Sequence, residues 1–138
     1  MIDYKAGTPI VEALGEHARN GIDVYFDNVG GDHLDAALAH ARMRARFALC
    51  GMIDIYNAAE PTSLRYIGRM VGMRVRAQGF IVTDFAGRAA EFYRDMGGWL
   101  KDGKLRREET VIDGLDRMPE AFLGLFSGHN KGKMLVRV

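Results

Sequence analysis

The chain of 138 residues contains a single cysteine, Cys50. One cysteine excludes an intramolecular disulfide framework and a thiolate metal cluster. The four histidines stand far apart without the spacing of metal ligands, so no metal site is predicted. No apolar run reaches the length of about 18 residues that a membrane-spanning helix needs. The chain does not open with a basic segment followed by an apolar one, so the expected location is the cytoplasm.

The chain also has almost no net charge, because 19 basic residues face 18 acidic ones and leave a formal charge of +1. Nucleic-acid-binding and membrane-surface proteins typically carry a one-sided basic excess, so neither partner is predicted. The densest basic cluster, Arg42, Arg44 and Arg46, has two interpretations. It could bind phosphate, or it could be the last turn of a helix, where cations offset the macrodipole; the helix end is favoured.

What the chain does contain is enough apolar material for a core, since 48% of its residues are hydrophobic. Strand-like and helix-like segments alternate along it. Strands are expected at residues 21–30, 46–53 and 73–82, and helices at residues 8–20, 31–41, 63–72 and 87–102. This alternation is typical of an α/β fold with a parallel sheet and right-handed crossovers. The final residues form a strand (106–114), a helix from Pro119 to Gly128, and a strand (131–138).

Three details of these segments are specific enough to test. The first helix should have Thr8 as its N-cap and Pro9 as its first helical residue. The first strand is an apolar run rich in β-branched and aromatic residues, which is typical of a strand covered on both faces. The helix after Gly31 carries one apolar stripe, which consists of Leu34, Ala37, Leu38 and Ala41.

The stretch from Val24 to Leu38 places two adjacent glycines, Gly30 and Gly31, between a strand and a helix. The glycines could serve a tight turn, or they could let a ligand lie against bare backbone; the second interpretation is favoured. Ligands of parallel α/β sheets bind beyond the carboxyl ends of the strands. Three stretches fall there: residues 28–31, 50–57 and 80–84.

Several familiar nucleotide-binding and catalytic motifs are missing. The sequence has no G-x-G-x-x-G, no G-x-x-x-x-G-K-[ST], no G-x-S-x-G and no H-E-x-x-H. Cys50 could be a nucleophile, but a small buried hydrophobe is favoured because no histidine lies near it in the sequence. Asp27 could be a general base or could cap the turn after the strand together with Asn28. The residues alone therefore predict an α/β protein that binds a nucleotide.

Five stretches, "DYK", "YFDNVGG", "LCGMIDIYN", "GFIV" and "GHNKGKMLVRV", occur in this order at a spacing that is more specific than any one of them. With them the chain resembles the C-terminal part of a zinc-independent medium-chain dehydrogenase/reductase, in the branch of the prostaglandin reductases and alkenal double-bond reductases. The resemblance implies NADPH as the cofactor and α,β-unsaturated ketones or aldehydes as substrates. It implies that residues 1–103 are the second half of a Rossmann doubly wound parallel sheet. Residues 104–138 would then be the returning segment of the catalytic, GroES-like domain.

The resemblance also implies a set of cofactor contacts. They are Tyr4, Asn28, Cys50, Gly51, Met52, Ile53, Asp54, Ile55, Tyr56, Phe80, Ile81, Val82 and Asn130. Tyr56 is the candidate catalytic residue, as a hydrogen-bond donor to the enolate oxygen that forms when hydride reaches the β-carbon. Its alternative is an aromatic that only packs on the cofactor. For Asn28 and Asn130 the alternative is a role in a turn, and for Phe80 to Val82 it is ordinary packing in the core of a strand. Asp54 departs from the family, which usually carries serine at this position.

The resemblance leaves other functions open. The chain alone is expected to be inactive and to bind the cofactor weakly, because the pyrophosphate site lies on a glycine-rich loop that these residues do not include. It could instead be a truncated, non-catalytic oligomerisation module. In either case a homodimer is expected through the edge strand around Arg74–Val82. A quinone reductase of the same superfamily is the remaining alternative.

Overall fold

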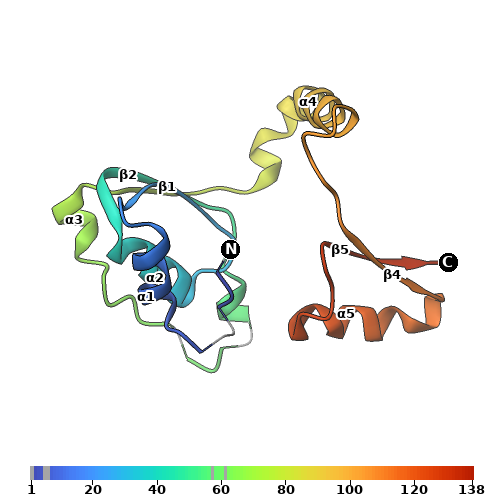
Figure 1. The fold of residues 1–138 in the computed structure, drawn as a ribbon, viewed down its shortest axis with the longest axis horizontal. Helices are drawn as coiled ribbons and strands as arrows, with labels where there is room; N and C mark the ends of the chain where they lie inside the picture. Colours follow the sequence, from blue (N-terminus) through green and yellow to red (C-terminus); the bar gives the residue numbers. More distant parts are fainter. Residues whose placement is uncertain (1, 5–6, 57, 61) are drawn as a thin grey trace. The chain divides into compact units, whose positions relative to one another are not determined.

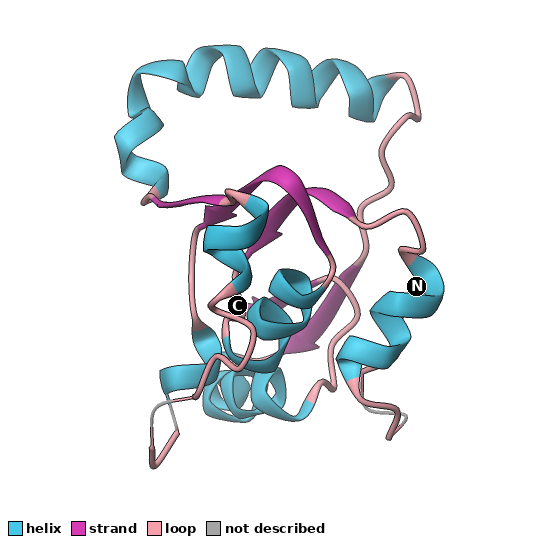
Figure 2. Cartoon of the chain, turned by 90° about the vertical axis from the view of Figure 1, so that its left-hand side faces the viewer, coloured by secondary structure: helices cyan, strands magenta, loops and turns pink. Residues whose placement is uncertain are grey.

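The computed structural model describes residues 2–4, 7–56, 58–60 and 62–138, and divides into two compact units, Met1–Ala86 and Gly87–Val138. Figure 2 distinguishes the helices from the strands along the chain. In each unit every strand pairing is parallel, which confirms the predicted α/β class. Among the described residues, no helix is long and apolar enough to cross a membrane.

The first unit contains a three-stranded sheet and helices (Figure 1), and the strand order of the sheet is β1-β2-β3. Its strands are β1 (Ile22–Asp27), β2 (Ala41–Leu49) and β3 (Arg76–Gly79), and its helices are α1 (Ile10–His17), α2 (Gly31–Ala39), η1 (Ile53–Tyr56) and α3 (Arg69–Met73). Helices α1 and α2 pack against each other. Strands that are consecutive in the chain are therefore neighbours in this sheet, as the alternating pattern predicts.

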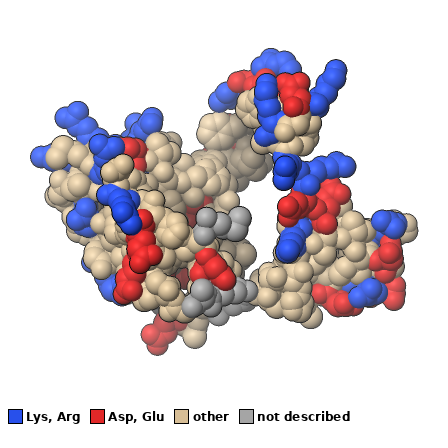
Figure 3. All heavy atoms as spheres, viewed as in Figure 1, with Lys and Arg blue, Asp and Glu red and all other residues tan. Residues whose placement is uncertain are grey.

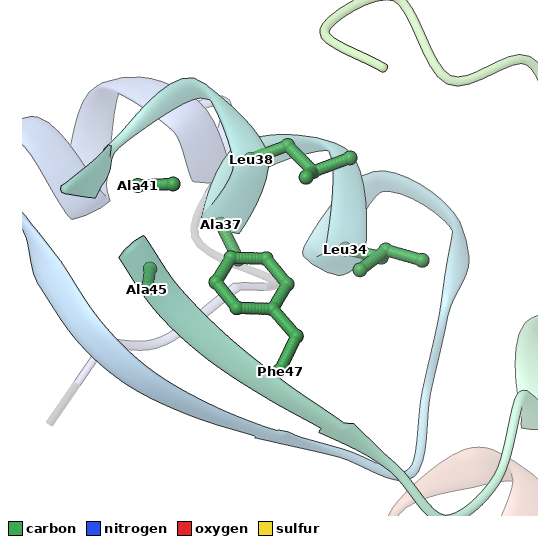
Figure 4. Close-up of a cluster of buried hydrophobic side chains, with 6 residues drawn as sticks. All are labelled: Leu34, Ala37, Leu38, Ala41, Ala45 and Phe47. Atoms are coloured by element: carbon green, nitrogen blue, oxygen red, sulfur yellow. The ribbon is translucent and has the colours of Figure 1, made fainter. Parts of the chain in front are cut away.

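The core of this unit lies between α2 and β2 (Figure 4). The helix contributes Leu34, Ala37 and Leu38, and the strand contributes Ala45 and Phe47; all of these are buried. The predicted stripe is thus confirmed, except that Ala41, also buried, opens β2 instead of extending the helix. Burying one such leucine or phenylalanine typically stabilises a fold by about 1.5–3 kcal/mol.

Helix α1 begins one residue later than the cap prediction requires. Pro9, not Thr8, occupies the N-cap position, with φ −54° and ψ 135°, and no side chain caps the helix. The extended ψ places Pro9 outside the helix, while its carbonyl accepts bonds from the amides of Glu12 and Ala13. The prediction of a Thr8 cap is therefore wrong.

The basic cluster does not end a helix. Helix α2 stops at Ala39, and Arg42, Arg44 and Arg46 are exposed residues of β2. The pairing of β1 with β2 jumps from Ile22↔Ala41 to Val24↔Arg46, and Arg44 has a positive φ of 65°. The strand therefore bulges where the arginines lie, and the helix-end interpretation is wrong. On the face seen in Figure 3, each unit shows both basic and acidic side chains.

Strand β1 is covered on one face. Tyr25 packs against the core and Asp27 is buried, whereas Val24 and Phe26 are 60% and 58% exposed. Successive side chains of a strand point to opposite faces, so the open face is the one opposite the core. The expectation that both faces are covered does not hold for this chain. A hollow of about 480 Å³ lies on the open face, lined by residues that include Val24, Ala48 and Phe80.

The second unit contains the predicted strand–helix–strand tail. Its elements are α4 (Ala89–Lys101), β4 (Glu109–Asp113), η3 (Leu115–Arg117), α5 (Met118–Ser127) and β5 (Lys133–Arg137), and η2 (Val82–Arg88) precedes them. Strands β4 and β5 pair in parallel. Helix α4 continues through Gly97 and Gly98, and α5 closes at Gly128, as predicted. Gly128 adopts the left-handed conformation, with φ 72°.

Candidate functional site

The three strands of the first unit end level with one another. Asp27 pairs with Leu49, and Leu49 pairs with Gly79. The next residues are joined across the strands, because the amides of Cys50 and Gly51 donate to the Asp27 carbonyl at 2.8 and 3.1 Å. The Phe80 amide donates to the Leu49 carbonyl at 3.1 Å. The three stretches expected at the carboxyl ends of the strands therefore meet at one edge, except that Asn57 lies outside the described residues.

A hollow of about 450 Å³ opens beyond the ends of β2 and β3. Its lining consists of Leu49, Cys50, Gly51, Met52, Gly79, Phe80, Ile81 and Asp84. Five of these were predicted to contact the cofactor: Cys50, Gly51, Met52, Phe80 and Ile81. The lining is mainly apolar and carries one carboxylate, so its chemistry suits a flat ring with little charge. We call this space the strand-end hollow.

The short helix η1 adds the predicted residues Ile53–Tyr56 to the same edge. The amide of Ile53 donates to the Asn28 carbonyl at 3.2 Å, and that of Asp54 donates to the Val29 carbonyl at 3.0 Å. Tyr56 closes η1 and is 70% exposed, so its phenol is accessible to a ligand. Asn28 is exposed as well, and a Cβ atom at Gly51 would lie only 3.3 Å from its carbonyl oxygen. What these side chains bind stays a prediction.

The two glycines after β1 serve the chain itself. Gly30 and Gly31 have φ of 74° and 50°, a conformation that L side chains rarely adopt. A Cβ at Gly30 would lie 3.1 Å from the side chain of Met52, and one at Gly31 would collide with the carboxylate of Asp54. The expectation that these glycines leave room for an external ligand is therefore wrong, since residues 52–54 occupy that room.

Asp27 caps the turn that contains these glycines. It is 1% exposed, and its Oδ1 accepts hydrogen bonds from the amides of Val29 and Gly30 at 2.8 and 2.9 Å. Its Oδ2 is also buried and has no hydrogen-bond partner among the described residues. Burial and the neighbouring Asp27 carboxylate raise the pKa of the Tyr25 phenol well above its usual value. This inward placement supports the capping role of Asp27 and not that of a general base.

One of the predicted backbone contacts is already engaged. The Ile81 amide donates to the Asp84 carboxylate at 3.1 Å, and the Asp84 amide donates back to the Ile81 carbonyl at 3.0 Å. A carboxamide could take the Ile81 amide only by displacing Asp84. Ile81 and Val82 are 66% and 71% exposed, whereas the Phe80 ring packs edge-to-face on Phe26 and Phe85, so the strand-core alternative describes Phe80 but neither of the others.

The two outlying predicted residues lie differently. Tyr4 packs edge-to-face on His33, in the first turn of α2, with ring centroids 5.4 Å apart. Asn130 belongs to the second unit, and its side-chain amide donates to the Gly132 carbonyl at 2.7 Å within its own turn. That bond is the turn chemistry considered as the alternative. A cofactor role for Tyr4 or Asn130 stays a prediction.

Two residues of this edge were not among the predicted contact residues. Asp84 could have been found, because it follows Ile81 by three residues at a helix start, which is the spacing of a capping box. Thr62 donates to Asp54 at 2.7 Å across eight positions, and no sequence pattern announces that contact. Within residues 2–4, 7–56, 58–60 and 62–138, no three His, Cys, Asp or Glu side chains come together as metal ligands would.

Comparison with known proteins identifies the family of this chain. The model of the zinc-binding dehydrogenase family matches residues 1–136. The NADPH-dependent curcumin reductase of Escherichia coli is 40% identical over 133 residues, which are 92% of this chain and 39% of that protein. The NADP-dependent 2-alkenal reductase of Nicotiana tabacum is 37% identical over 136 residues, which are 99% of this chain and 40% of that protein.

The structural comparison agrees. CurA from Vibrio vulnificus, solved in complex with NADPH, has a TM-score of 0.88 and 40% sequence identity, over 99% of this chain and 42% of CurA. The chain thus spans about 40% of the length of the relatives that it matches. It belongs to the zinc-binding dehydrogenase family, and it corresponds to the C-terminal part of the longer medium-chain reductases in it.

Proposed function

We propose that this chain is the C-terminal part of an NADPH-dependent oxidoreductase that reduces the carbon–carbon double bond of α,β-unsaturated ketones or aldehydes. The observation that carries the proposal is the single edge at which Asn28, Cys50–Tyr56 and Phe80 meet. Support comes from relatives named as curcumin and 2-alkenal reductases, and from 40% identity to a protein solved with NADPH.

The residues of the edge fit a nicotinamide cofactor. The strand-end hollow offers an apolar surface from Met52 and Phe80 together with backbone of Gly51, which suits one face of a nicotinamide ring. The cofactor, when bound, supplies the hydride that the β-carbon of the substrate accepts. In this proposal Asn28 and the 50–56 segment hold the nicotinamide end. Residues 1–103 are the second half of the Rossmann domain, and residues 104–138 return to the catalytic domain.

Tyr56 acts on the substrate oxygen in this proposal. As hydride reaches the β-carbon, negative charge develops on the carbonyl oxygen, and a fixed hydrogen-bond donor lowers the free energy of that charge. The Tyr56 phenol is a hydrogen-bond donor and is exposed at the end of η1, so it can reach a substrate oxygen. The competing role, packing on the cofactor without donating, predicts little change in turnover when the hydroxyl is removed.

The proposed reductase activity is tested with the complete protein that carries this chain. Purified protein is given NADPH and benzylideneacetone, and NADPH oxidation is followed by absorbance while the product is identified by mass spectrometry and NMR. The expected product is the saturated ketone, with no reaction on benzylacetone, which lacks the double bond. An allylic alcohol as the product, or no NADPH oxidation with several enones and enals, would contradict the proposal.

The donor role has its own test in the Tyr56→Phe variant. Removing one such donor typically lowers kcat by about 10²–10³-fold, with little change in cofactor affinity. Tyr93→Phe is the matched control, because Tyr93 is also an exposed tyrosine (72%) but lies in α4. Unchanged turnover in Tyr56→Phe, with unchanged NADPH affinity, would leave only the packing role.

A homodimer is the proposed assembly, and the edge of the sheet supports it. Strand β3 is the last strand in the order β1-β2-β3, and all four of its residues, Arg76–Gly79, are exposed. An exposed edge can pair with the same edge of another copy. Sedimentation of the 138-residue chain tests this, since a dimer is expected. A dimer whose mass does not depend on NADPH also favours the second candidate function, a non-catalytic oligomerisation module.

A further inference from the structure

Asp54 lies against the backbone of Gly31, at the N-terminal end of α2. Gly31 is buried, and a Cβ built on it would lie 2.5 Å from Cγ of Asp54 and 3.1 Å from its Cβ. Any residue other than glycine at position 31 would therefore displace the Asp54 side chain. The Asp54 Oδ2 also accepts a hydrogen bond of 2.7 Å from the Thr62 hydroxyl.

The backbone around Asp54 is tied to the same turn. The amides of Ile53 and Asp54 donate to the carbonyls of Asn28 and Val29, so η1 is bonded to the turn that leads into α2. The N-terminal end of a helix carries partial positive charge, and a carboxylate placed beside it is favoured. Three kinds of contact thus hold η1: the backbone hydrogen bonds, the close contact with Gly31 and the hydrogen bond from the Thr62 hydroxyl.

This arrangement gives Asp54 a role different from direct ligand contact. We propose that Asp54 is a positioning residue. Its side chain lies against Gly31 and accepts a hydrogen bond from Thr62, and these contacts fix η1. The position of η1 in turn sets the position of the Tyr56 hydroxyl at the ends of the strands. The inference rests on the proposed reductase function. A displacement of about 1 Å in a group that meets the reacting atoms can cost about 10²-fold in rate, so the support of η1 bears directly on kcat.

Substitution of Asp54 in the complete protein separates positioning from cofactor binding. Asp54→Ala removes both the contact with Gly31 and the acceptor for Thr62. We expect kcat to fall about tenfold or more and KM for NADPH to rise by a smaller factor, because a dinucleotide is held largely through its pyrophosphate. Asp54→Asn keeps the size and an acceptor oxygen, so it should recover most of that loss. Asp23→Ala is the control, because Asp23 is an exposed partner of Arg42 at the other end of β1.

A double-mutant cycle with Gly31 tests the contact itself. Gly31→Ala introduces a methyl group where the Asp54 carboxylate lies, and it also strains a backbone with φ 50°. The strain is the same with either residue at position 54, so it cancels in the cycle. Gly31→Ala should therefore lower kcat much more in the presence of Asp54 than in the Asp54→Ala background. Additive losses would overturn the proposed contact.

Hydrogen–deuterium exchange gives a readout that does not need turnover. Exchange of the peptide that contains residues 52–56 should speed up in Asp54→Ala and stay near that of the unaltered protein in Asp54→Asn. If exchange and kcat are unchanged in Asp54→Ala, or if Asp54→Asn behaves like Asp54→Ala in both measurements, positioning by Asp54 is wrong. If the unaltered protein reduces no enone, the proposed function fails, while the exchange data still decide whether Asp54 holds η1.

Discussion

At the scale of single residues, two side chains of β1 that point toward the core, Tyr25 and Asp27, affect each other electrostatically. Asp27 is buried and caps the turn after the strand, and Tyr25 precedes it by two positions on the same face. Burial and the Asp27 carboxylate both raise the pKa of Tyr25, because each disfavours the phenolate. The folded state therefore keeps the phenol proton at a pH at which the unfolded chain loses it.

This shift predicts a loss of stability in alkali. The contribution of Tyr25 is complete below the unfolded pKa of about 10, and the free energy of unfolding should fall by up to about 1.4 kcal/mol per pH unit above it. Urea denaturation at about pH 9 and at about pH 11 measures the fall. Tyr25→Phe has no titrating group, so its curve should be flatter. Equal slopes in both proteins would show that Tyr25 titrates normally.

A glycine in the second unit gives another prediction at this scale. Gly132 has φ 67°, and a Cβ there would collide with the carbonyl of Glu108, which accepts a hydrogen bond from the Lys133 amide. Gly132→Ala should destabilise the protein by about 1–3 kcal/mol because the backbone must move. Gly103→Ala is the matched control, since its φ is also 67° but nothing lies within 4 Å of the added Cβ. Thermal unfolding compares them, and equal losses would leave strain alone as the cause.

At the scale of elements, α2 makes two kinds of contact in the first unit. One of its faces packs in the core, and its Asp35 carboxylate binds the segment that precedes β3. Asp35 is fully buried in α2, and its carboxylate accepts hydrogen bonds from Arg65 Nε at 2.9 Å and the Tyr66 amide at 2.8 Å. Arg69 continues this attachment by donating to the carbonyls of Leu38 and Ala41. The chain before β3 is thus attached by polar contacts to α2 and to the first residue of β2, and periodicity cannot reveal such contacts.

Removing the Asp35 carboxylate should release that attachment. Asp35→Ala leaves the Tyr66 amide without its acceptor, and we expect a loss of about 1–3 kcal/mol in the free energy of unfolding. Asp32→Ala is the control on the same helix, because Asp32 is 78% exposed in its side chain and lies 3.8 Å from Arg65. Its effect should stay below about 1 kcal/mol. Chemical denaturation of both variants measures the difference, and similar losses would mean that the buried position adds nothing.

At the scale of the whole molecule, the chain carries the nicotinamide side of the proposed site but not a glycine-rich pyrophosphate loop. A dinucleotide cofactor is held largely through its pyrophosphate at a helix N-terminus. The apolar side chains Val24 and Phe26 also remain exposed on one face of the sheet.

These features predict weak cofactor binding by the 138 residues alone. Calorimetric titration of the chain with NADPH should give little heat up to the millimolar range, whereas the complete protein should bind tightly. NADH serves as the comparison ligand for the complete protein, since it lacks the 2′-phosphate. Micromolar NADPH affinity in the 138-residue chain would contradict the prediction.

Much of the fold followed from local pattern. The 3.6-residue stripe of Leu34, Ala37 and Leu38 and the alternation of strands and helices report burial on one face, which is a property of short windows. The same windows misplaced the arginines of β2, because apolar spacing does not show that a strand bulges. They also could not show that Val24 and Phe26 stay exposed, because coverage depends on elements distant in sequence.

The sequence by itself determined the α/β class, the order of elements, the three stretches at the strand ends and, through their combination, the family. Only the tertiary structure decided what lies against Gly30 and Gly31, which is the chain's own Met52 and Asp54. It also decided that Asp27 faces inward and that Asp35 fastens the segment before β3. Propensity and periodicity act within a few residues, whereas these contacts join residues more than twenty positions apart in most cases, and only close packing brings such groups together.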